Sequence, residues 1–374
     1  MRNTPLIVLL FLLISSISFS QVYSDKIVGK RNTALRDSII DESYPYVLPI
    51  LGEKAAKKGF NLPYSAGVSM NYFWQKSDIV IHNLEVGFNN GTKYNLDEVV
   101  RFNDSYVTAS ALNVRPDIWL LPFLNVYGIL GKANTSTNIN AGIWVPDADN
   151  NWSKVLDFGT KAEFTGTTFG IGFTPTIGVG GGWLALDMNV AWTDIDELEK
   201  PARTFIFGPR LGKTFKFEGK EDMNIAVWTG AFRVHLNSGT SGSLALNDFI
   251  SVDGAQAKVD NAMDAVNDKQ AQVDAWWNGL TAAEQAKPTN KAKYNTANNA
   301  LEKAGNLLTG IDGAISTIGT STVQYSLEKA PKDAWNFIIG SQYQYNKHIM
   351  LRAECGFLGS RTQFLTSLQY RFGL

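Results

Sequence analysis

The residues that could perform catalysis are few and scattered. Hydrolysis of a lipid needs a Ser or Thr nucleophile beside a positioned histidine, and the sequence offers only His82, His235 and His348. The glycine-rich run 177–182 lacks the Lys-Ser/Thr pair that completes a phosphate-binding loop, and it leads into an expected strand. We therefore predict that the protein is not an enzyme, with a lipid hydrolase as a minor alternative.

Two acidic loops have the residue types of cation sites. The run 147–151 resembles the start of a calcium-binding loop, but Trp152 stands where that loop requires glycine and no Glu follows at its twelfth position. The second loop, 194–199, is interpreted as a solvated run of charge. The sequence therefore predicts no metal and no cofactor.

The more informative chemistry is a set of charges placed inside alternating segments. From 363 to 374, apolar and polar residues alternate with a period of two, which predicts a strand whose two faces meet different environments. Weaker or equal alternation recurs in 67–75, 79–88, 106–120, 124–131, 168–174, 184–193, 204–217, 223–236, 335–346 and 349–357. These segments predict about ten strands, or twelve if 67–75 and 79–88 are separate strands.

The length and content of these segments favour a membrane barrel over a soluble sandwich. Many run about eleven to fifteen residues, whereas soluble strands cluster near five or six and a tilted membrane strand needs about nine to eleven. Lipid leaves unpaired backbone groups without water, so such strands must close on themselves. The fold predicted is an all-β, antiparallel up-and-down transmembrane barrel, and a secreted all-β domain is the alternative.

In such a barrel the apolar face meets lipid and the polar face lines the lumen. The residues predicted to face the lumen are Arg115, Asp117, Asp187, Arg210, Arg233, His235, Arg352, Glu354 and Arg371. Aromatic residues near strand ends are predicted to lie at the two membrane interfaces. These are Trp119, Trp183, Trp192 and Trp335.

The first twenty residues have the pattern of an export signal. Arg2 precedes an unbroken apolar run from Leu6 to Ile14, and Ser18-Phe19-Ser20 offers small residues before a cleavage site. With 34 Lys+Arg against 35 Asp+Glu, the net charge of −1 provides no basic field for nucleic acid. The single cysteine, Cys355, has no partner for an intramolecular disulfide.

The chain resembles the outer-membrane β-barrel proteins of Gram-negative, Bacteroidota-like bacteria. The resemblance rests on the signal that ends Ser18-Phe19-Ser20-Gln21 and on the terminal strand 368–374, Leu-Gln-Tyr-Arg-Phe-Gly-Leu. It implies an outer-membrane location, contact with lipid and lipopolysaccharide, and recognition of Tyr370 and Phe372 by the barrel-assembly machinery. The last residue departs from the family pattern, because Leu374 stands where Phe is commoner.

The predicted organisation has four parts: a signal at 1–20, an N-terminal segment at 21–65, a barrel at 66–374, and a helical hairpin inserted at 252–318. The N-terminal segment is either a plug in the lumen or a periplasmic tail. The hairpin, with apolar stripes at helical spacing, is either a surface element that binds a partner or a lid on the barrel. The connections predicted to lie outside the cell are 89–103, 134–160, 194–202 and 237–334.

The charged lumen is the basis of the functional prediction. Barrels of about eight strands are filled by side chains, and those of sixteen or more leave a water-filled channel. A barrel of ten to twelve strands with a basic bias favours a narrow, porin-like channel or transporter for small polar or anionic solutes. The alternative is a non-conducting barrel that displays its hairpin for adhesion or as a receptor.

Overall fold

The computed structural model describes residues 25–26, 33–42, 44–196, 201–217, 219–237, 239–246, 254–317 and 320–374. The predicted export signal at 1–20 lies outside the described residues. Within the described ranges, no helix is long and apolar enough to cross a membrane.

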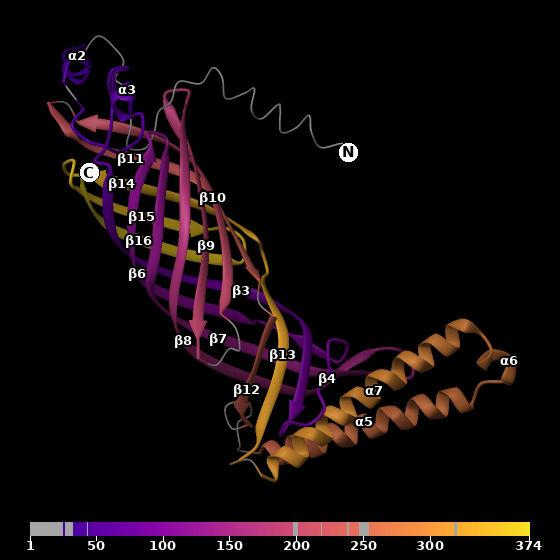
Figure 1. Ribbon diagram of the computed structural model, residues 1–374. Helices are drawn as coiled ribbons and strands as arrows, with labels where there is room; N and C mark the ends of the chain where they lie inside the picture. Colours follow the sequence, from indigo (N-terminus) through magenta and orange to yellow (C-terminus); the bar gives the residue numbers. More distant parts are fainter. Residues whose placement is uncertain are drawn as a thin grey trace.

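Ten antiparallel strands form a closed barrel (Figure 1). Each strand pairs with its neighbour along the chain, and the last strand pairs with the first from Phe372 and Ala66 to Arg361 and Ser77. The ten strands are β3 (Ala66–Phe88), β6 (Tyr106–Leu121), β7 (Leu124–Pro146), β8 (Trp152–Val179), β9 (Gly182–Ile195), β10 (Ala202–Phe217), β11 (Lys220–Asn237), β14 (Trp335–Gln344), β15 (Ile349–Phe357) and β16 (Arg361–Phe372). The predicted up-and-down barrel is therefore confirmed, with ten strands.

The barrel wall is apolar outside and polar inside. Large apolar side chains are exposed on the outer face of every barrel strand except β9, for example Met70, Ile171 and Leu368. The buried side chains of the inner face include Ser69, Asn71, Arg210 and Arg371. This distribution is the reverse of a water-soluble fold and suits a wall surrounded by hydrocarbon.

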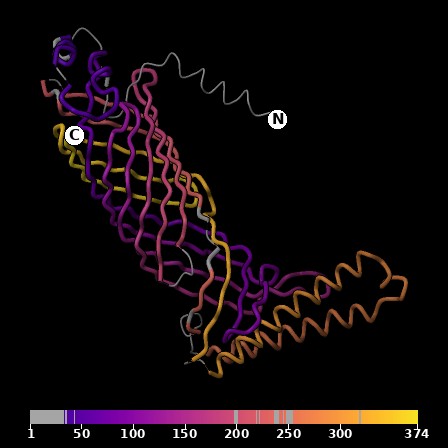
Figure 2. The backbone as a smooth tube through the Cα atoms, in the orientation of Figure 1, coloured from indigo at the N-terminus to yellow at the C-terminus, as the bar shows by residue number. Residues whose placement is uncertain are grey.

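Three strands continue far beyond the barrel. β8 has 28 residues and β3 and β7 have 23 each, whereas β15 has only 9. Figure 2 shows these long strands running past the barrel toward the helices. The prediction of a loop at 134–160 is wrong, because β7 and β8 pair up to Pro146 and Trp152 and leave only 147–151 as the turn. Likewise 66–88 is one strand, since β3 pairs with β6 up to Asp78 and with β13 from Ile79 onward, with one irregularity opposite Ser326 and Glu328.

The projecting parts of β3, β7 and β8 join shorter elements to form what we call the outer extension. Its further strands are β4 (Tyr94–Asn95), β5 (Val100–Phe102), β12 (Gly239–Ala245) and β13 (Thr322–Pro331). Its helices are α5 (Ala255–Asn278), α6 (Ala282–Gln285) and α7 (Pro288–Ile315), which together form the predicted helical hairpin. In Figure 1 the hairpin lies at the end of the molecule opposite the C-terminus.

The outer extension has a conventional hydrophobic core. The apolar stripes of α5 and α7, including Val266, Leu301 and Leu308, pack with residues of the extended strands such as Val86 and Ile143. Three ion pairs add to this contact: Lys303 to Glu98 at 2.8 Å, Lys269 to Asp147 at 3.7 Å and Lys293 to Asp149 at 3.9 Å. The acidic loop 147–151 thus contacts lysines of the hairpin.

Strand β8 shows how one strand serves both environments. In the barrel, its outward residues Phe169, Ile171 and Phe173 are exposed and apolar. In the outer extension, Phe158 and Phe164 face an inner apolar cavity, while Lys161 and Glu163 form an exposed ion pair on the outer face. The outward face of β8 is therefore apolar in the barrel and charged in the outer extension, as expected where the strand passes from lipid into water.

The N-terminal elements lie at the end of the barrel that holds the C-terminus (Figure 1). They are β1 (Asp25–Lys26), α2 (Thr33–Asp41), α3 (Gly52–Ala56) and β2 (Phe60–Asn61). The backbone N–H of Val47 donates to the carbonyl of Leu374 at 2.9 Å, and that of Ile50 donates to Leu120 at 2.9 Å. These bonds fix the described part of the segment against the strand ends.

Candidate functional site in the barrel lumen

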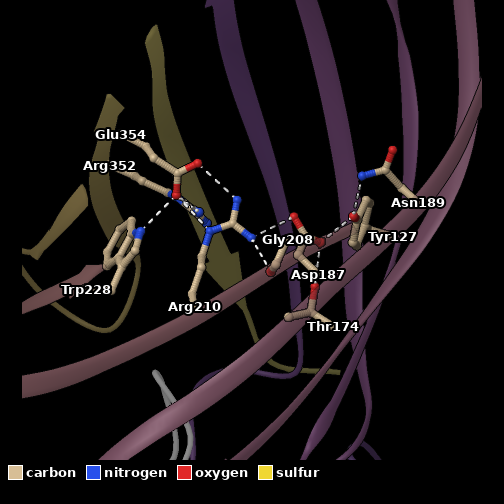
Figure 3. Close-up of polar contacts among 9 residues, drawn as sticks. All are labelled: Tyr127, Thr174, Asp187, Asn189, Gly208, Arg210, Trp228, Arg352 and Glu354. Carbon is tan, nitrogen blue, oxygen red and sulfur yellow. Dashed lines mark hydrogen bonds and ion pairs between the residues drawn. The ribbon is translucent and has the colours of Figure 1, made fainter. Parts of the chain in front are cut away.

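The centre of the lumen holds a network of buried ions (Figure 3). Arg210 of β10 forms two parallel hydrogen bonds with Glu354 of β15, from Nε at 2.7 Å and from Nη2 at 3.0 Å. Its Nη1 reaches Asp187 of β9 at 3.3 Å. Arg352 contacts Glu354 from the same strand at 3.1 Å. Because the strands wrap around the lumen, residues 144 positions apart meet across it.

Neutral donors complete the coordination of the two carboxylates. Asp187 accepts hydrogen bonds from the Tyr127 hydroxyl at 2.6 Å and the Thr174 hydroxyl at 2.9 Å. Glu354 accepts a bond from the indole N–H of Trp228 at 2.8 Å. A buried ion pair is tolerated only when further hydrogen bonds offset the loss of hydration. These donors supply that compensation.

A second network lies nearer the C-terminus. Arg371 of β16 pairs with Asp117 of β6 at 2.9 Å, and both side chains are almost fully buried. Asp117 also accepts bonds from Asn125 at 2.7 Å and Gln369 at 2.8 Å. The Nε of Arg371 donates to the carbonyl of Tyr64 at 3.0 Å. This network joins β6 and β7 to the last strand, β16, and to the N-terminal segment.

A cavity of about 270 Å³ lies beside these networks, and all ten barrel strands contribute lining residues. Its charged lining comprises Arg115, Arg210, Arg352, Arg371, Asp117 and Asp187. Glu354 pairs with Arg210 and Arg352. Together with the two lining aspartates it makes three carboxylates against four arginines. The cavity is therefore polar and carries an excess of positive charge.

Arg115 and Arg352 line the cavity, and each guanidinium lies over an aromatic ring. The Arg115 guanidinium stacks on the Tyr127 ring with 3.3 Å from its carbon to the ring centroid. The Arg352 guanidinium lies 4.8 Å from the Trp228 ring, and a quarter of its side chain is exposed. Aromatic faces hold the guanidinium planes in place. Both cations can therefore meet a solute without large rearrangement.

Seven of the nine residues predicted to face the lumen lie there. They are Arg115, Asp117, Asp187, Arg210, Arg352, Glu354 and Arg371. The prediction is wrong for Arg233 and His235, whose side chains are exposed on the outer face of β11. Arg233 lies over the outward ring of Trp335, at 5.7 Å. The apolar residues Trp228 and Phe232 occupy the inner face of β11 instead, because Trp228 has an N–H group that serves Glu354.

The predicted interface aromatics also divide into two groups. Trp335 is exposed on the outer face at the start of β14, and Trp192, near the end of β9, stacks on the exposed ring of Phe169 with 5.5 Å between the ring centroids. Both therefore lie on the outer face near strand ends. The prediction is wrong for Trp119 and Trp183, which are buried and line the lumen cavity. Tyr370 and Phe372, the predicted assembly signal, face outward on β16.

The prediction missed the inward aromatic rings for two reasons. Trp119 and Trp183 were assigned to the interfaces because they lie near strand ends, and the apolar face of β11, with Trp228, was assigned to lipid. A signal for them exists in the register. Gly212 lies opposite both Trp183 and Trp228, and an added Cβ would meet the Trp183 ring at 2.3 Å. Gly340 likewise lies opposite Trp228. A glycine that pairs with an aromatic residue on the adjacent strand therefore indicates that the ring lies over the glycine, on the lumen side of the wall.

The three histidines lie outside the lumen cavity. The Nδ1–H of His348 donates to the Arg371 carbonyl at 2.8 Å in a turn, and His82 and His235 are exposed, so none of the three lines the cavity. No cluster of three or more metal-ligating side chains occurs among the described residues. The closed wall, apolar belt and polar lumen define the class: a β-barrel of the outer-membrane type.

Comparisons with known proteins found distant structural likenesses. No family model and no curated protein sequence matches the chain. The transport unit of the autotransporter AIDA-I from Escherichia coli is 7% identical, with 93% of this chain and 100% of that chain covered and a TM-score of 0.29.

An outer membrane channel from Pseudomonas putida F1 is 9% identical, with 83% and 95% covered and a TM-score of 0.27. A FadL homologue from Pseudomonas aeruginosa is 7% identical, with 95% and 100% covered and a TM-score of 0.27.

Proposed function

We propose that the protein is an outer-membrane barrel that admits small polar solutes through its lumen, with a preference for anions. The observation that carries the proposal is the polar cavity bounded by all ten strands, in which Arg115 and Arg352 remain accessible beside neutralised ion pairs. A fixed excess of positive charge in a low-dielectric wall attracts anions. Neither catalysis nor a cofactor is part of the proposal.

Conductance of the purified protein in a planar lipid bilayer tests this proposal. We expect small, steady openings whose reversal potential in a KCl gradient indicates selectivity for chloride. Arg352→Gln removes a cavity cation and should shift the selectivity toward potassium. Arg233→Gln is the matched control, because Arg233 lies on the outer face. Silence of the folded protein, or equal shifts in both variants, would contradict the proposal.

A second candidate function is display of the outer extension to a partner. The observation that favours it is the separate hydrophobic core of this region, which stabilises the hairpin without the barrel lumen. Among the described residues, none of the hairpin lines the lumen cavity. Deletion of 255–315 separates the functions: a display protein loses partner binding with unchanged conductance, whereas a lid predicts increased conductance.

The proposed location in the outer membrane carries further expectations about partners. Lipid and lipopolysaccharide would surround the apolar belt, and the outward residues Tyr370 and Phe372 would be available to the assembly machinery. Substituting both by Ser should slow assembly. The measurement is the fraction of heat-modifiable protein, since folded barrels migrate differently before and after boiling.

A further inference from the structure

The N-terminal segment carries apolar side chains that no described part of the protein covers. Val47 is 86% exposed, and Ile50 and Leu51 are each 51% exposed. Single exposed apolar residues are ordinary, but several together on a short segment mark a surface that contacts something else. We call residues 44–51 the collar segment.

The collar segment is fixed in position against the end of the barrel. Its backbone donates to Leu374, beyond the end of β16, and to Leu120 of β6. The Tyr44 hydroxyl donates to the Leu48 carbonyl at 2.7 Å, which braces the segment internally. On the other side, the Ser65 hydroxyl accepts a bond from the N–H of Leu374 at 2.9 Å. The exposed apolar side chains are therefore held at one level along the barrel axis.

That level is the edge of the lipid-facing belt. Leu374 just beyond the last strand, Tyr370 on that strand and Ile118 on β6 are exposed close to the bonds that hold the collar segment. The apolar surface of the collar segment is thus continuous with the surface that the barrel presents to hydrocarbon.

Aromatic rings connect the collar segment to the belt. Tyr46 contacts Tyr44 at 5.6 Å and Tyr64 at 5.8 Å between ring centroids. The series continues from Tyr64 to His348 at 4.7 Å and from His348 to Tyr370 at 5.5 Å. Rings with one polar edge concentrate where hydrocarbon meets head groups, which places this series at the membrane interface.

The residues that follow the collar segment suit a lipid surface. Lys54, Lys57 and Lys58 are exposed in and just after α3, and Lys57 also pairs with Glu53 at 2.5 Å. Lysines beside an apolar insertion attract anionic head groups. We propose that Val47, Ile50 and Leu51 insert into the lipid leaflet at the C-terminal end of the barrel, so that the collar segment anchors this end to anionic phospholipid.

The inference depends on the proposed membrane barrel, and native Cys355 allows the two to be tested separately. Cys355 is exposed on the outer face of β15 and is the only cysteine. A nitroxide label on it reports on the barrel wall. In a Cys355→Ala background, Val47→Cys and Ile50→Cys report on the collar segment, and Lys258→Cys on the exposed face of α5 reports on water.

Each labelled protein is reconstituted in vesicles of phosphatidylethanolamine and phosphatidylglycerol. Collision of the nitroxide with oxygen, which concentrates in hydrocarbon, is compared with collision with a water-soluble nickel chelate. We expect a several-fold higher oxygen-to-nickel ratio at 47, 50 and 355 than at 258.

A lipid-like ratio at 355 with a water-like ratio at 47 and 50 would overturn the anchor and leave the barrel intact. A water-like ratio at 355 would instead overturn the membrane barrel on which the anchor depends. Because these positions are exposed, the substitutions should preserve folding, and heat modifiability confirms it for each variant.

Discussion

The barrel and the outer extension bury opposite kinds of side chain. In the barrel, apolar residues such as Leu368 face outward and ions such as Arg210 and Glu354 are buried. In the outer extension, Leu301 and Leu308 are buried and charged residues such as Glu163 are exposed. Strand β8 takes part in both regions. The solvent around each part of a strand, rather than its alternation, therefore determines which face is apolar.

The largest expected effect comes from removing a buried charge in the barrel. Glu354→Ala leaves Arg210 and Arg352 without their shared carboxylate, and breaking such a pair costs about 3–5 kcal/mol. The measurement is urea unfolding in lipid vesicles. Glu163→Ala, in the outer extension, is the control and should change stability by less than about 0.5 kcal/mol. Equal effects would show that the Glu354 network is not stabilising.

Truncating one leucine in each region compares a packed core with a lipid-facing surface. Leu308→Ala creates a cavity in the outer extension and should cost about 2–5 kcal/mol there. Leu368→Ala leaves no internal cavity, because lipid fills the space, and should cost much less. Hydrogen exchange of α5 and α7, measured against that of the barrel strands, locates each loss. Faster exchange in the barrel of Leu308→Ala would contradict the independence of the two cores.

Placing a charge at two outward positions of β8 tests where the strand leaves the membrane. Ile171→Arg puts a cation against hydrocarbon and should cost about 2–4 kcal/mol if the position is near the midplane. Thr165→Arg, on the same face in the outer extension, should be nearly neutral. Unfolding in vesicles measures both. Similar small losses would indicate that β8 is surrounded by water throughout.

The smallest expected effect concerns pH and the turn of the outer extension. The backbone N–H groups of Asn151 and Asp149 donate to Asp147 and lower the pKa of its carboxyl. A lowered pKa in the folded state contributes stability above the ordinary Asp pKa of about 3.9, and this is lost as the pH falls through the folded value.

Asp147→Asn should therefore lower the thermal stability of the outer extension at pH 7, by under about 1 kcal/mol because the group is partly exposed. The difference from the wild type should vanish in acid. Fluorescence of Trp276 and Trp277 in the hairpin follows the transition. A difference that persists below the lowered pKa would show that the carboxylate charge is not its cause.

The alternation of the last strand and the helical spacing of 255–315 were sufficient to predict the barrel and the hairpin. They succeed because local side-chain periodicity follows directly from strand and helix geometry. Alternation also placed Asp187, Arg352 and Arg371 on the inner face. It failed for Arg233 and His235, since it assigned to lipid the face of β11 that carries Trp228 and Phe232. Trp119 and Trp183 alternate in step with Asp117 and Asp187, and the expectation that aromatic residues near strand ends lie at the membrane interfaces misplaced them. The lumen accepts a ring that has a donor or lies beside glycine.

The sequence by itself determined the elements, their antiparallel order and most of the inward charges, because these depend on neighbouring residues. Only the tertiary structure decided which charges meet, since Arg210 and Glu354 become partners through closure of the wall across 144 positions. It also decided that β3, β7 and β8 extend beyond the barrel, because a strand continues wherever a partner and a second apolar layer are present. Here the hairpin provides that layer.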